Sequence, residues 1–172
     1  PDGEFDNGCI YASSPVTDGQ KVWVYYMGGN GQHTNFRESS LGRAYWEADK
    51  FACWTGRKEG IESILTTTTL TLSGDYVEVL ADVVDTEKDW ELAASVHPVW
   101  TENAYEGLRI EDAVTEKSGR WIRISWKGKK LPDKSGCIRF QFKNLKIWAV
   151  RGELEYKGHR LWEGADMENE GM

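Results

Sequence analysis

The sequence predicts an all-β fold, an antiparallel two-layer β-sandwich or jelly roll. Three observations support this prediction. Apolar and polar residues alternate with a period of two over short runs, Gly-rich turn signals separate these runs, and no stretch has the period of a long amphipathic helix. A chain of many short strands joined by such turns folds as a sandwich or barrel.

The expected strands follow one another along most of the chain. Turn residues stand between them, as in the Gly-rich run from Gly28 to Gly31. The segment Arg109–Lys117 is the one place where a helical turn is expected. The predicted strands are Cys9–Ala12, Val22–Met27, Arg43–Glu47, Ile64–Leu72, Tyr76–Val84, Leu92–Val96, Trp121–Lys127, Ile138–Lys143 and Leu145–Val150.

The length of 172 residues suits one domain with a substantial core. We expect a single β-sandwich domain over residues 1–160 and an acidic tail over residues 161–172. The chain begins at Pro1 with neither an initiator Met nor a signal peptide, which predicts a processed chain or an excised fragment. We expect a secreted or extracellular location.

Charge and composition exclude several classes of protein. The net charge of -7 and the pI near 5.1 argue against nucleic-acid binding, which needs a basic face, and no apolar run is long enough for a membrane span. The spacing of Cys9, Cys53 and Cys137 is not that of metal ligands. The sequence allows either one disulfide and one free thiol or three unpaired thiols. We expect no cofactor. Sandwich modules often carry a structural calcium, but no Asp-rich loop with ligand spacing is present.

Strand parity separates the expected core from the expected surface. In Trp121–Lys127, Ile138–Lys143 and Tyr76–Val84 one face is apolar and the other polar, which is typical of strands with one buried side. From this parity we predict as core residues Trp46, Trp126, Phe140 and Phe142.

The chain is rich in aromatic residues, with 9 Trp and 7 Tyr, and a Trp-rich β core is expected to hold most of them. One or two are expected to be exposed platforms on which a sugar ring stacks. Trp121 shares the polar parity of its strand, and Arg123, Arg139 and Gln141 supply groups that bind sugar hydroxyls. The loop over residues 129–136 is short, so we expect the strands Trp121–Lys127 and Ile138–Lys143 to pair. This pairing would bring the four residues together on one face. The alternative is that Trp121 covers a sheet edge or packs against the N-terminal segment.

Three further residues are secondary candidates for sugar contacts. Glu78 and Asp82 are expected to face outward from Tyr76–Val84, although acidic residues on such strands usually form a solvated face. His33 follows the Gly-rich loop, and a locally hydrogen-bonded imidazole is the preferred interpretation for it.

Several stretches together resemble five-bladed β-propeller glycosidases and their relatives, the broad group around glycoside hydrolase families 32, 43 and 68. The order of the stretches carries the resemblance, and residues 1–36 are similar to the hairpin of a final propeller blade. Two residues depart from the pattern, Glu47 where the family has Arg and Lys50 where it has Gly. The matching stretches are Asp6–Val16, Val22–His33, Gly42–Ala52, Thr67–Gly74, Val77–Asp82, Tyr105–Leu108, Ile122–Gly128 and Cys137–Val150.

The resemblance implies a non-catalytic accessory module that binds a poly- or oligosaccharide. In that family the catalytic carboxylates lie in earlier blades of the propeller, so hydrolysis by this chain is not implied. The alternative is a structural or interaction domain that packs against a catalytic propeller and binds no sugar. A third hypothesis, a self-contained hydrolase, would need a pair of carboxylates that the sequence does not identify.

Overall fold

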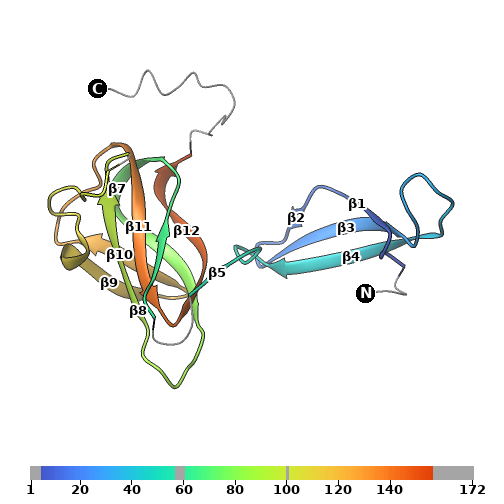
Figure 1. Ribbon diagram of the computed structural model, residues 1–172, viewed down its shortest axis with the longest axis horizontal. Coiled ribbons are helices and arrows are strands. Elements are labelled where there is room, and N and C mark those ends of the chain that lie inside the picture. The colour runs from blue at the N-terminus through green and yellow to red at the C-terminus, as the bar shows by residue number, and fades with distance from the viewer. Residues whose placement is uncertain (1–4, 57–60, 100, 157–172) are drawn as a thin grey trace. The chain divides into compact units, whose positions relative to one another are not determined.

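The computed structural model describes residues 5–56, 61–99 and 101–156, and it confirms the all-β prediction (Figure 1). Every strand pair in it is antiparallel. Within the described ranges, the only helical element is the 3-10 turn η1 (Ile110–Asp112), and no helix has the length and apolar character needed to cross a membrane. The acidic tail expected over residues 161–172 lies outside the described residues.

The chain divides into two compact units, Pro1–Cys53 and Trp54–Met172, where the sequence predicted one domain over residues 1–160. The first unit is one sheet made of β1 (Cys9–Ala12), β2 (Val16–Thr17), β3 (Lys21–Gly29) and β4 (Ser39–Glu47). β4 pairs with β3 along its whole length, so β1 and β2 share the opposite edge of β3.

Asp18 closes the turn between β2 and β3. Its Oδ2 accepts a hydrogen bond from Trp23 Nε1 at 3.0 Å, and its Oδ1 accepts from the backbone N–H groups of Lys21 and Gln20 at 2.7 and 2.9 Å. These bonds, led by the one from Trp23, hold the pKa of Asp18 at about 2. The carboxylate is therefore ionised at any physiological pH, and it fixes the register in which β3 begins.

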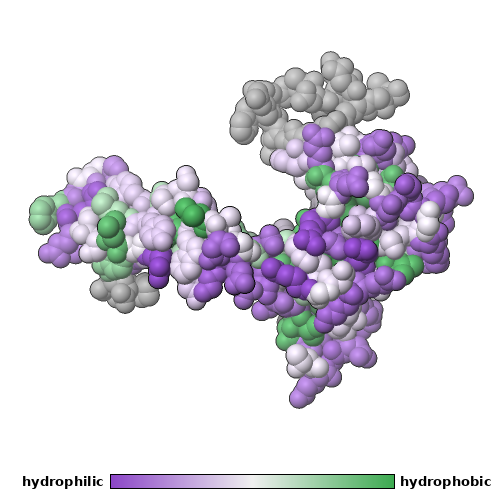
Figure 2. Space-filling view, turned by 180° about the vertical axis from the view of Figure 1, so that it is seen from behind, coloured by the Kyte–Doolittle hydropathy of each residue, from purple (hydrophilic) through white to green (hydrophobic). Residues whose placement is uncertain are grey.

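The N-terminal sheet has no buried apolar core among its described residues. Among the described residues, every buried large apolar side chain lies in the second unit, while Figure 2 shows apolar patches on the surface of the first. A sheet of this size needs an apolar face that is covered. The exposed apolar residues of the N-terminal sheet and its loops are Phe5, Ile10, Tyr11, Val16, Tyr25, Met27, Phe36, Leu41, Tyr45 and Phe51.

Trp46 is not a core residue, and this prediction was wrong. It is only half-buried and contacts Phe51, which is itself 77% exposed, with 4.9 Å between the ring centroids. Parity assigned Trp46 to one face of β4, but no second layer within the described residues of the N-terminal unit covers that face. Nearby, Lys50 and Glu47 form an ion pair, with 3.2 Å between Lys50 Nζ and Glu47 Oε2. These are the two residues that differ from the pattern of the resembled family.

The second unit is a sandwich of two antiparallel layers. The first layer has the strand order β5 (Trp54–Thr55), β12 (Leu145–Glu155), β7 (Leu70–Val83), β10 (Trp121–Trp126) and β9 (Ala113–Ser118). The second layer contains β6 (Ser63–Thr66), β11 (Lys134–Lys143) and β8 (Glu91–His97). The helical turn expected over residues 109–117 is correct only for η1, since residues 113–118 form β9.

β11 joins the two layers. Its first residues, from Lys134 to Gly136, pair with β7, and the rest pairs with β8 and β6. Gly136 stands at the crossing, where a Cβ atom would lie 2.7 Å from the carbonyl oxygen of His97 and 3.0 Å from Leu72 Cδ1. The close approach of backbone at the crossing therefore requires glycine.

The core between the layers consists of the side chains on the apolar face of each strand. Trp126 and Phe140 are fully buried and Phe142 is 3% exposed, as predicted. The indole Nε1 of Trp126 donates to the carbonyl oxygen of Ala94 at 3.0 Å, which ties β10 to β8 in the other layer. Cys9, Cys53 and Cys137 form no disulfide in the described part of the chain.

Candidate functional site

The outer face of the first layer carries a carboxylate held between two guanidinium groups. Strand register places Arg123 of β10 and Arg151 of β12 on either side of Glu78 in β7. Arg123 Nη2 donates to Glu78 Oε1 at 3.1 Å, and Arg151 Nε donates to Glu78 Oε2 at 2.8 Å. Glu78 is only 6% exposed because the two arginines cover it.

The electrostatics of Glu78 follow from this geometry. Burial favours the neutral acid, but the hydrogen bonds from Arg151 and Arg123 and their charges outweigh burial and hold the pKa of Glu78 below its usual value. The carboxylate is therefore ionised at neutral pH and acts as the anchor of the network. A group with a lowered pKa and both oxygens engaged is a poor general acid.

Trp121 lies on this same outer face, but its indole is not exposed. It stands opposite Leu80 in the register and is 6% exposed, with Arg151 Cζ 4.0 Å from its ring centroid. Parity correctly predicted that Trp121 points away from the core, but the side chain of Arg151 on β12 covers the indole. The expectation of an open stacking platform at Trp121 is therefore corrected.

Arg139 and Gln141 belong to the other layer. β11 pairs with β6, β7 and β8, whereas β10 pairs with β7 and β9, so the expected pairing of their two strands is wrong. Arg139 Nη1 instead donates to Glu102 Oε2 at 3.0 Å. The predicted group of four thus separates into two pairs on opposite faces of the sandwich.

The secondary candidates also separate. Asp82 lies on the face of Glu78, where its Oδ2 accepts a hydrogen bond from Trp148 Nε1 at 2.8 Å. His33 lies in the N-terminal unit, with its ring 5.5 Å from that of Tyr11, and its carbonyl oxygen accepts from Arg37 Nη1 at 2.6 Å. Across residues 5–56, 61–99 and 101–156, no three His, Cys, Asp or Glu side chains are grouped as metal ligands.

Ser95 and His97 form a close pair on the second layer. Ser95 Oγ lies 2.8 Å from His97 Nε2, a distance typical of a nucleophile and its base. Both residues are buried, at 3% and 6% exposure, and burial lowers the pKa of His97. Burial closes the pair to a substrate in this structure, and its visible contribution is to the packing of β8.

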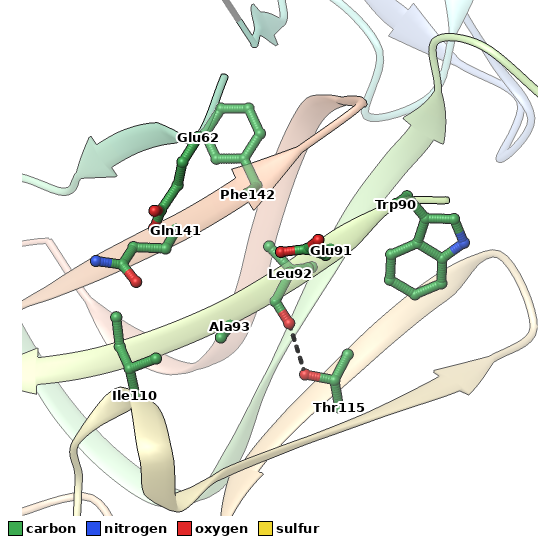
Figure 3. Close-up of a pocket in the computed structure, with 9 residues that line it drawn as sticks. All are labelled: Glu62, Trp90, Glu91, Leu92, Ala93, Ile110, Thr115, Gln141 and Phe142. Carbon is green, nitrogen blue, oxygen red and sulfur yellow. Dashed lines mark hydrogen bonds between the residues drawn. The ribbon is translucent and has the colours of Figure 1, made fainter. Parts of the chain in front are cut away.

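A cleft of about 410 Å³ opens beside β8 and β11. Figure 3 shows the indole of Trp90 at one end of the cleft and the side chains of Glu62 and Gln141 at the other. On one side β8 is tied to β9, because Thr115 Oγ1 donates to the carbonyl oxygen of Leu92 at 2.8 Å (Figure 3). The remaining lining residues are Glu91, Ala93, Ile110 and Phe142.

The cleft combines an indole with polar groups that bind hydroxyls. Trp90 is 36% exposed, so part of its ring is open to a ligand. Glu91 Oε1 is held 3.3 Å from Lys143 Nζ on the neighbouring strand, which orients the carboxylate at the rim. Carboxylates accept hydroxyl hydrogen bonds, and the amide of Gln141 both donates and accepts them. The arrangement suits a neutral polyhydroxy ligand with one apolar face.

Of the residues that line this cleft, only Gln141 was predicted from the sequence as a sugar contact. Trp90 ends a polar loop, and the period-two pattern that sorted the other aromatic residues does not apply there. Among the described tryptophans only Trp54 and Trp90 are exposed. A Trp at the end of an acidic loop, directly before a strand, was the available signal.

The Glu78 network gives a stability prediction with a matched control. Glu78→Gln should lower the free energy of unfolding by about 1–3 kcal/mol, because charge-assisted bonds to a buried acceptor are lost. As the control, Asp75 and Lys130 form an ion pair in which the side chains are 64% and 78% exposed, respectively. Asp75→Asn breaks this pair and should lower the free energy of unfolding by less than about 1 kcal/mol. Chemical denaturation of both variants makes the comparison. An equal loss in both would mean that Glu78 is no more than a surface charge.

The same residue predicts a pH dependence. Because the pKa of Glu78 is lower in the folded chain than its ordinary value of 4.5, its contribution is present above that pH. The contribution is lost as the pH falls below it and the carboxylate takes up a proton. Wild type and Glu78→Gln should therefore converge in stability at acidic pH, which denaturation at pH 7 and pH 3 would test.

Comparison of the chain with protein-family models, with curated proteins and with solved structures gives no match.

Proposed function

We propose that the chain is a non-catalytic carbohydrate-binding module whose ligand site is the Trp90 cleft. The observation that carries the proposal is the partly exposed indole of Trp90 in a cleft whose rim holds Glu62, Glu91 and Gln141. A pyranose ring stacks its C–H face on an indole and directs its hydroxyls outward to such groups. The resemblance to glycosidase-like proteins supports the same class of ligand.

The charge of the rim selects among sugars. Glu62 and Glu91 are both acidic, and one of them is partly neutralised by Lys143. A uronic acid or sulfated sugar would meet like charge there, which costs binding energy. Neutral poly- or oligosaccharides are therefore the proposed ligands.

Affinity electrophoresis in gels that contain neutral polysaccharides tests the proposal. Trp90→Ala should weaken retention on the order of 5- to 150-fold, by analogy with the roughly 1–3 kcal/mol that a base stacked on an aromatic ring contributes. The control is Trp54→Ala, which removes an indole that is 66% exposed and outside the cleft. Loss of retention in Trp54→Ala alone would place the site elsewhere, and no retention of the wild type in any neutral glycan would refute the function.

A second candidate function, an interaction domain, is supported by the N-terminal sheet. Ten large apolar side chains of this unit are exposed, and none is among the buried core residues of the described chain. Such a sheet suits packing between other β-sheets, for instance those of a catalytic propeller. Hydrogen exchange tests this idea in the isolated chain. Amides of β3 should exchange much faster than those of β10, and equal protection would mean that the sheet needs no cover.

A further inference from the structure

β4 leaves one edge of the N-terminal sheet open. It is a strand of nine residues that pairs with β3 on one side, and no described strand pairs with its other side. A long edge of this kind presents backbone N–H and C=O groups to any strand that can align with it. Leu41 and Tyr45 on this strand are 87% and 56% exposed.

The two edges of this sheet differ in their protection. The edge opposite β4 is broken into β1 of four residues and β2 of two residues, with Pro15 between them. Short strands and proline are features that block edge-to-edge pairing. β4 contains no proline, and its register with β3 runs without a bulge from Ser39 to Glu47. Only the β4 edge is therefore suited to accept another strand.

We propose that the strand it accepts is β4 of a second copy of the chain. The argument is charge complementarity on one face of the strand. Arg43 and Glu47 are four residues apart and share the face that also holds Tyr45. When two β4 strands pair antiparallel about a two-fold axis at Tyr45, each Arg43 lies opposite Glu47 of the other copy.

This register satisfies both faces of the paired strands. On the charged face it forms two opposite-charge pairs and brings the two Tyr45 rings together, and cross-strand pairs of both kinds are stabilising. On the other face it sets Ala44 opposite Trp46 of the second copy, a small side chain beside a large one. A two-fold axis at Arg43 would instead oppose two guanidinium groups.

The two charged side chains are available for this pairing. The side chain of Glu47 is 65% exposed, and Lys50 contacts its Oε2. Arg43 stacks the face of its guanidinium on Trp23, with 4.6 Å from Cζ to the ring centroid. Stacking uses the face of a guanidinium and leaves its edge N–H groups free to donate to a carboxylate. The result is an isologous dimer that joins the two N-terminal sheets.

Charge reversal tests the dimer by sedimentation equilibrium. Wild type should dimerise, and Arg43→Glu and Glu47→Arg should each raise the dimer dissociation constant about tenfold or more, because each opposes like charges twice. The double variant Arg43→Glu/Glu47→Arg should dimerise like wild type. A mixture of the two single variants should also form dimers, since their charges complement each other.

Controls separate a specific interface from a general effect of charge. Glu106→Arg makes the same change as Glu47→Arg on an exposed turn of the second unit, outside the cleft lining, and should leave the dimer intact. Circular dichroism must show that every variant is folded. A monomeric wild type, single variants that dimerise like wild type, or a double variant that stays monomeric would each overturn the proposal. Glycan retention at the Trp90 cleft should be the same in all of these variants, so either proposal can fail without the other.

Discussion

Trp126→Ala is expected to lower the free energy of unfolding of the second unit by about 3–5 kcal/mol, the cost typical of emptying a buried aromatic site. Trp126 is fully buried at the end of β10, and its Nε1 donates to the carbonyl oxygen of Ala94 in the opposite layer. Truncation removes the packed indole and also leaves that carbonyl without its donor. The melting midpoint should fall by roughly 10–25 °C.

The control for this prediction is another tryptophan of the same unit. Trp54 is 66% exposed, and Trp54→Ala should change the free energy of unfolding by about 0.5 kcal/mol or less. Differential scanning calorimetry of both variants gives the comparison. Equal midpoints for Trp126→Ala and wild type would contradict the assignment of Trp126 to the core.

Asn144→Ala is expected to cost about 2–4 kcal/mol and to weaken glycan retention at the same time. Asn144 connects β11 to β12 with a φ of 57°, a left-handed conformation that Asn tolerates better than Ala. Its Nδ2 donates to the carbonyl oxygens of Asp85 and Lys88 at 2.8 and 3.0 Å, and its Oδ1 accepts from the N–H of Asp85 at 2.9 Å.

These bonds hold the loop that leads into Trp90, so Asn144 is a positioning residue for the cleft. Asn144→Gly separates the contribution of the left-handed backbone from that of the side-chain hydrogen bonds, because glycine adopts the same φ but has no amide. It should keep part of the stability and still lose retention, whereas Asn144→Asp keeps the acceptor and loses the donors. If Asn144→Ala unfolds the chain, Asn144→Gly remains the informative variant. Full retention by a folded Asn144→Gly would contradict the positioning role.

Local patterns predicted which side of each strand faces the core. Alternation within a strand sufficed for Trp126, Phe140 and Phe142, since successive side chains point to opposite faces whatever the neighbouring strand is. The same rule misled at Trp46, because parity assigns a face but does not reveal whether a second layer covers it. The expected helical turn included residues 113–117, but these residues pair with β10 as part of β9.

The candidate site was predictable only in part. Glu78, Asp82, Trp121 and Arg123 do share the outer face of one layer, as parity indicated. Arg151 was not anticipated there, because it comes from β12 and reaches Glu78 across 73 positions of sequence. That one side chain converts an expected stacking platform into a closed cation–π contact with Trp121.

Local sequence patterns are enough to predict the all-β class, the apolar face of each sandwich strand and the chemical types of the side chains on the outer faces. These properties depend on neighbours two residues apart, and a single chain displays them directly. Which strands lie side by side becomes visible only in the folded chain, and this neighbourhood separates Trp121 from Gln141 and opens the cleft at Trp90. Strand pairing depends on contacts between distant segments, which no local period encodes. Exposure follows the same rule, because a side chain such as that of Trp121 is covered or open according to what a distant strand places above it.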